Sequence, residues 1–109
     1  MFLELLGLAV VVATAIYLVK ITAEWLRMKL EEMRAIKVCY EDIDRTIRNC
    51  KSNLTREDLR KLREDGYTNV LYATKSDGTM DVEIIKHKGN DAEIEERMKR
   101  NDGMTVIQG

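Results

Sequence analysis

The chain has 109 residues, a formal net charge of −1 and no proline. This length excludes a multidomain architecture and leaves room for one small domain beside any membrane-spanning segment. The charges are unevenly distributed, because residues 20–63 carry 12 Lys and Arg against 8 Asp and Glu, whereas residues 64–109 carry 6 against 10. The basic part therefore follows the apolar N-terminus, and the acidic part lies farther along the chain.

Residues 1–20 form an apolar segment that contains one charged side chain, Glu4, and ends at Lys20. Eighteen helical residues would extend about 27 Å, close to the hydrocarbon thickness of a bilayer. We therefore predict a transmembrane anchor with Glu4 near its outer end and with Lys20 and Trp25 at the membrane interface. A cleaved signal peptide is disfavoured because no basic residue precedes Lys20. The basic residues that follow predict an N-terminus outside and a C-terminal part in the cytoplasm.

Residues 21–52 are predicted to form an amphipathic stalk helix that continues the anchor. Their apolar side chains recur at the heptad spacing of a parallel coiled coil. The predicted oligomer seam consists of Leu26, Met33, Ile36, Tyr40, Ile43, Ile47 and Cys50. The same stripe could instead pack against the rest of the chain, and the sequence leaves both arrangements open. On one helix Cys39 and Cys50 would lie too far apart for a disulfide.

Residues 53–109 are predicted to form a small α+β head, which begins with a helix. Thr55 is the expected N-cap and Asp58 the residue at N3, a variant of the capping box. The helix is expected to run to Asp65 and to stop at Gly66, since glycine readily adopts the left-handed conformation at a helix C-terminus.

A β-hairpin of residues 69–74 and 80–86 is predicted next, with Asp77-Gly78 as a two-residue turn. This turn would pair residue 73 with residue 82 and would place five apolar side chains on the core face: Leu71, Ala73, Met80, Val82 and Ile84. The opposite face would carry Val70, Tyr72 and Ile85, a candidate face for a partner. A helix from Asp91 to about Arg100 and a short strand at 104–108 complete the head.

No residue pattern indicates a catalytic centre, a cofactor or a metal site. His87, the single histidine, is expected at an ordinary surface position, and together with Cys39 and Cys50 it lacks metal-ligand spacing. Basic side chains in the 56–63 segment are interleaved with acidic ones, so nucleic acid is an unlikely partner.

The sequence therefore favours a non-enzymatic, single-pass membrane protein that forms a parallel homo-oligomer and whose cytoplasmic head binds a protein partner. The expected partners are the lipid bilayer, further copies of the chain and an unidentified protein. The alternative is a small membrane effector or channel-forming oligomer whose head controls the packing of its transmembrane helices.

Overall fold

The computed structural model describes residues 2–5 and 8–109. The strands are β1 (Phe2–Leu5), β2 (Leu8–Ile16), β3 (Lys37–Asp42), β4 (Asn69–Thr74), β5 (Met80–Lys86) and β6 (Met104–Gln108). The helices are α1 (Ala23–Glu32), α2 (Ile43–Asn49), α3 (Asn53–Glu64) and α4 (Ala92–Arg100).

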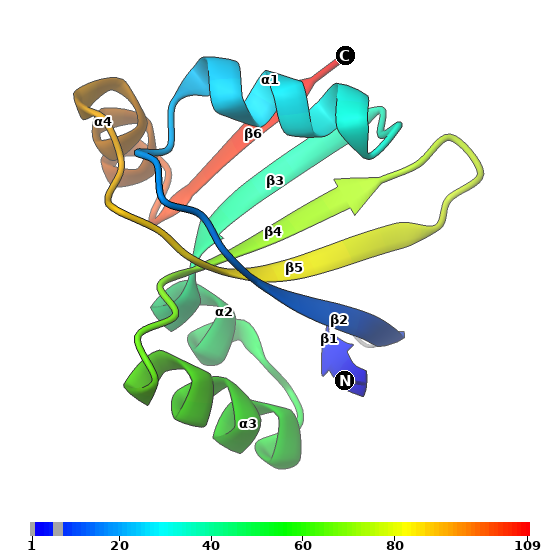
Figure 1. Cartoon of the computed structure of the whole chain (residues 1–109). Helices are drawn as coiled ribbons and strands as arrows, with labels where there is room; N and C mark the ends of the chain where they lie inside the picture. Colours follow the sequence, from blue (N-terminus) through cyan, green and yellow to red (C-terminus); the bar gives the residue numbers. More distant parts are fainter. Residues whose placement is uncertain (1, 6–7) are drawn as a thin grey trace.

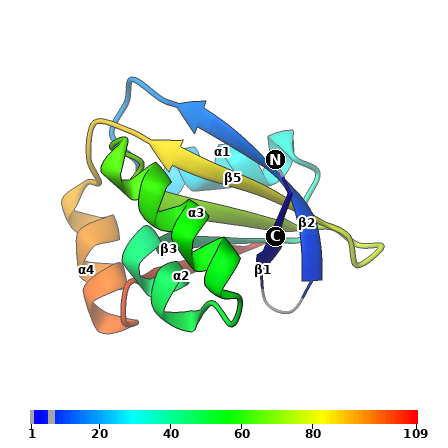
Figure 2. The ribbon, with the colours of Figure 1, turned by 90° about the horizontal axis from the view of Figure 1, so that it is seen from below.

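The strands follow one another in the order β1-β2-β5-β4-β3-β6. β2 runs parallel to β5, whereas the β1–β2, β5–β4, β4–β3 and β3–β6 pairs are antiparallel. Helices α1 and α4 cover one face of the sheet, and α2 and α3 cover the other (Figures 1 and 2). The described chain therefore forms three layers, with helices on both sides of a mixed sheet.

Each face of the sheet has its own hydrophobic core. The core under α1 and α4 includes Leu26, Leu30, Ile94 and Met98 from the helices. The core under α2 and α3 is built from Ile43, Ile47, Leu59, Val70, Tyr72, Val82, Ile84 and Val12. Because both faces are covered, a central strand such as β4 is apolar on both sides rather than alternating.

The predicted transmembrane anchor at 1–20 is wrong. Residues 2–5 and 8–16 form the β1–β2 hairpin instead, and β2 joins the sheet through the pairing of Val12–Ile16 with Val82–Lys86. No helix within the described residues is long and apolar enough to cross a bilayer, which also removes the basis for the predicted topology. A buried parallel strand can be as continuously apolar as a membrane helix, and β-branched residues such as Val10–Val12 favour the strand.

The predicted stalk helix at 21–52 is also wrong, because this segment is divided into α1, β3 and α2. Helix α1 ends where Arg34 adopts a left-handed conformation, with φ of +52°, and the Ala35 N–H donates to the Leu30 carbonyl. The chain then reverses into β3, where Val38 and Tyr40 point into one core. The apolar residues of α1 and α2 recur at helical spacing, and those of β3 recur at every second position. Taken together along the chain, these two spacings resembled a heptad pattern.

The C-terminal elements were predicted more accurately. The spans of β4, β5 and β6 match the predicted strands, and α4 begins after Asp91, whose carboxylate caps it by accepting from the Ile94 N–H at 2.9 Å. Helix α3 ends as predicted before Gly66, which has φ of +98°. It begins earlier than expected, because Ser52 rather than Thr55 is the N-cap.

The register of the hairpin differs from the prediction by one residue. Tyr72 pairs with Val82 and Ala73 with Asp81, because the turn contains three residues, 76–78, rather than two. Gly78 donates to the Lys75 carbonyl and has φ of +86°, the geometry of a type I turn followed by a glycine bulge. This shift puts Leu71 and Ala73 under α1 and α4, and puts Val82 and Ile84 on the opposite face.

Candidate functional site

A pocket of about 1040 Å³ opens at the end of the sheet where β3 and β5 finish and β4 and β6 begin. Helices α2 and α3 border it on one side and α4 on the other (Figure 1). Its charged lining residues are Asp42, Asp44, Arg45, Arg48, Arg63, Glu95, Glu96, Lys99 and Asp102. Its uncharged polar lining residues include Thr68, Asn69, His87 and Asn90.

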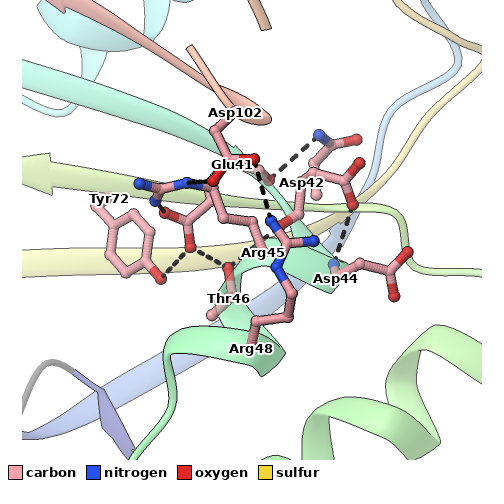
Figure 3. Close-up of polar contacts among 9 residues, drawn as sticks. Glu41, Asp42, Asp44, Arg45, Thr46, Arg48, Tyr72 and Asp102 are labelled. Carbon is pink, nitrogen blue, oxygen red and sulfur yellow. Dashed lines mark hydrogen bonds and ion pairs between the residues drawn. The ribbon is translucent and has the colours of Figure 1, made fainter. Parts of the chain in front are cut away.

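A buried carboxylate, Glu41, is paired with the pocket-lining Arg45, and only 7% of its surface is exposed. Its Oε1 accepts from the Thr46 hydroxyl and, at 3.3 Å, from the Tyr72 hydroxyl, while Oε2 accepts from Arg45 Nη1. Figure 3 shows Tyr72, Thr46 and Arg45 arranged around this carboxylate. Three donors therefore offset the free-energy cost of burying the charge.

The arginines of the rim are each paired with a carboxylate. Arg45 also approaches Asp102, with 3.9 Å between Nε and Oδ2, and Arg48 Nη2 lies 3.5 Å from Oδ1 of the same residue. Arg63, from α3, pairs with Asp44, from α2. These pairs connect α2 to α3 and to the turn before β6, so they brace the rim of the pocket. Figure 3 shows Arg45 and Arg48 beside Asp102.

The floor of the pocket on the α4 side is a network around His87. Its Nδ1 accepts from the Gly89 N–H at 2.8 Å, which assigns the proton of the neutral ring to Nε2. Nε2 lies 2.6 Å from Asn69 Oδ1 and 2.8 Å from the Tyr40 hydroxyl oxygen. The Tyr40 hydroxyl in turn donates to Asn90 Oδ1 at 2.6 Å. Asn69 Nδ2 donates to the backbone carbonyl of Glu41, which joins this network to β3.

This network keeps the imidazole of His87 neutral. Burial lowers the pKa of His87 below its ordinary value, although Glu95 opposes the shift. Protonation of Nδ1 would also break the hydrogen bond from Gly89. A ring with both nitrogens occupied holds the floor in place and has no free lone pair with which to act as a general base.

A second buried ion pair lies away from the pocket, between α1 and β5. Lys29 is 2% exposed, and its Nζ donates to Glu83 at 2.9 Å and to the Tyr17 hydroxyl at 3.0 Å. Burial alone would lower the pKa of Lys29, but its hydrogen bonds to Tyr17 and Glu83 raise it above the ordinary value. Tyr17 also packs edge-on against Trp25. Lys29 is thus held as an ammonium, which is not nucleophilic.

The two cysteines lie in different elements, since Cys39 is on β3 and Cys50 follows α2. Burial raises the pKa of the Cys39 thiol to about 11, so its thiolate is scarce. Across the described residues, no group of three or more His, Cys, Asp or Glu side chains could hold a metal ion.

The residues predicted as an oligomer seam are spread over three elements and both cores. Leu26 and Tyr40 lie in one core and Ile43 and Ile47 in the other, whereas Ile36 is 53% exposed. Cys50 is buried and Met33 packs against the α1 core. The helix on which this seam depended is absent.

The other predicted site residues also take structural positions. Of the residues predicted at the membrane, Lys20 is exposed in a loop and Trp25 lies on α1 and packs against the core beneath α1 and α4, while the side chain of Glu4 lies outside the described residues. Val70, Tyr72 and Ile85, predicted to share a partner-binding face, are all buried, and the first two face the α2 core while Ile85 faces the α1 core.

Sequence reasoning missed Glu41, Arg45, Asn69 and Asn90, and it placed His87 on an ordinary surface. The contact between Asn69 and His87 could have been predicted from the sequence. Asn69 begins the first strand of the hairpin and His87 follows the second, so the hairpin brings both residues to the same end of the sheet. Nothing in the sequence indicated that Glu41 would be buried. A comparison of the chain with protein-family models, curated proteins and solved structures finds no match.

Proposed function

We propose that this protein is a non-catalytic binding domain that takes a small cationic organic ligand, such as an amine or a guanidine, in the pocket at the end of the sheet. The proposal rests on the excess of negative charge that remains around this pocket once the ion pairs of its lining residues are counted. Arg45, Arg48 and Arg63 are paired with carboxylates, whereas Asp42, Glu95 and Glu96 form no ion pair within the described residues. Lys99 is the remaining cation of the lining, which leaves three carboxylates against one ammonium.

The floor supports binding rather than chemistry. The orientation of Asn90 is fixed on both sides, because its Oδ1 accepts from Tyr40 and its Nδ2 donates to Glu95 at 3.1 Å. A fixed amide group can recognise a polar ligand with little loss of side-chain entropy on binding. The neutral His87, the protonated Lys29 and the weakly acidic Cys39 all favour a binding role over catalysis. The same excess of carboxylates disfavours nucleic acid as a ligand.

Titration of the ¹⁵N-labelled protein with agmatine, followed by NMR, tests this function, with the dianion glutarate as the matched control. We expect agmatine to shift the amide signals of Asn90, Glu95 and Glu96, and glutarate to leave them unchanged. Glu95→Gln and Glu96→Gln should each weaken binding about twofold to fivefold, the range of an exposed ion pair.

Glu93→Gln is the control variant, because Glu93 lies on the same helix, is exposed and pairs with Arg97 outside the pocket. It should leave the affinity for agmatine unchanged. Binding of glutarate in preference to agmatine, with loss of that binding in Arg48→Ala, would replace the proposed cation site with an anion site.

A further inference from the structure

Strand β6 is the edge of the sheet opposite the β1–β2 hairpin, and one side of its backbone faces outward (Figures 1 and 2). The Asp42 N–H donates to the Gly103 carbonyl and the Gly109 N–H to the Ile36 carbonyl. With the observed register, this pattern makes residues 105 and 107 the ones that bond to β3. The N–H and carbonyl groups of Met104, Val106 and Gln108 therefore point away from the sheet.

This edge lacks the features that usually prevent pairing with another chain. Natural edge strands are protected by charged side chains, proline or a covering segment. β6 has the sequence Met-Thr-Val-Ile-Gln, without charge or proline, and its three central residues are β-branched. Val106 is 41% exposed and lies opposite Cys39, on the sheet face that α2 and α3 cover farther along the sheet. Strand addition at such an edge is a common mode of peptide recognition.

A groove of about 450 Å³ lies beside this edge, between β6 and the C-terminal end of α4. Its lining residues are Arg97, Arg100, Asn101, Met104, Thr105 and Val106. Arg97 pairs with Glu93, but Arg100 is exposed and forms no ion pair within the described residues. The polar side of the groove therefore carries positive charge, while Met104 and Val106 supply its apolar side.

We propose that β6 binds an extended segment of a partner protein in which apolar and acidic residues alternate. Directly opposed residues of paired strands share a face of the sheet. A residue of the added strand opposite Thr105 would therefore lie on the α4 face, where an acidic side chain meets Arg100. Residues opposite Met104 and Val106 would lie on the other face, where apolar side chains extend the exposed apolar surface.

A second copy of this chain fits the edge less well. Pairing of β6 with β6 of another copy would offer Arg100 only the side chains of Met, Thr, Val, Ile and Gln. No register of such a pair brings an acidic residue of β6 to the groove. The positive charge beside β6 thus favours an acidic strand from a different protein. This inference does not depend on whether the pocket at the end of the sheet binds a ligand.

Fluorescence anisotropy with a labelled heptapeptide that alternates valine and glutamate, beginning and ending with valine, tests this proposal at 150 mM salt. A peptide with lysine in place of glutamate should bind at least about tenfold more weakly. A glutamate peptide with N-methylated valines and glutamates should also lose binding, because it cannot complete the backbone hydrogen bonds in either strand direction, although the protein itself is unchanged. Equal binding of either control peptide, or no binding of the glutamate peptide, overturns the proposal.

Two protein variants locate the site. Arg100→Glu should weaken the glutamate peptide about tenfold and strengthen the lysine peptide, whereas Lys99→Glu, the same charge change on the pocket side of α4, should alter either affinity less than about twofold. Val106→Pro removes an outward N–H and should abolish binding, with folding checked by circular dichroism. A wild-type dimer that Val106→Pro converts to a monomer, together with no peptide binding, would identify a second copy as the occupant and overturn the proposal.

Discussion

Two carboxylates in this protein, Glu83 and Glu41, each bind a basic side chain, and the two basic side chains differ in their access to solvent. In the Lys29–Glu83 pair, between α1 and β5, the cation is enclosed: Tyr17 completes its hydrogen bonds, and the Lys29 side chain is 3% exposed against 14% for Glu83. The Arg45–Glu41 pair opens toward a pocket, and the Arg45 side chain is 21% exposed. The charges of the enclosed pair are stabilised mainly by the groups that form it. The charges of the open pair can also be stabilised by water in the pocket, and this pair can contact a ligand bound there.

The largest effect is expected when the enclosed pair is broken. Lys29→Met leaves Glu83 and the Tyr17 hydroxyl without their cation and should lower the free energy of unfolding by about 3–5 kcal/mol in urea denaturation. The double variant Lys29→Met, Glu83→Leu removes both charges and should recover most of that loss. A single-variant loss below about 1 kcal/mol would show that solvent reaches this pair and would remove the contrast.

A smaller effect is expected at the open pair. Arg45→Met should lower the free energy of unfolding by about 1–3 kcal/mol, because Glu41 keeps its bonds from Thr46 and Tyr72 and water can enter from the pocket. The measurement is the same urea titration, and Arg48→Met, an exposed rim residue, is the control. A loss from Arg45→Met equal to that from Lys29→Met would make the two pairs equivalent.

A single hydroxyl group at the open pair should matter less again. Thr46→Val preserves shape and removes one donor to Glu41, so we expect a loss of about 1 kcal/mol. If the donors to Glu41 act as one network, Thr46→Val in the Arg45→Met background should cost more than in the wild type, and equal costs would mean independent donors.

The smallest effect concerns the pH dependence of the pocket floor. Burial lowers the folded-state pKa of His87, so the unfolded chain binds this proton more readily. The stability contributed by neutral His87 is therefore complete above about pH 6.5, the unfolded value, and is lost as the pH falls from there toward the folded pKa. Because His87 is the single histidine, its NMR titration is unambiguous, and its midpoint should lie below 6.5. A midpoint at or above 6.5 would contradict a neutral ring.

Local signals in the C-terminal half predicted its elements well. Asp91 before α4, Gly66 after α3 and Gly78 in the hairpin turn each act on the few residues beside them, so their effect can be read along the chain. The candidate site was not predictable in the same way. Glu41, Asn69 and His87 lie together only because β3 and β5 finish, and β4 begins, at the same end of the sheet. Their hydrogen bonds join residues that are 18 and 28 positions apart in the sequence.

The sequence by itself determined the strands and helices after residue 52 and the positions at which most of them end. Tertiary structure decided everything that depended on a neighbour: that residues 8–16 form a strand beside β5, that residues 37–42 turn back as β3, and that Glu41 and Lys29 are buried with partners. The physical reason is that an apolar run fits a buried strand as well as a helix. The choice is made by the hydrogen-bonding partners and the second apolar face that only the assembled sheet provides.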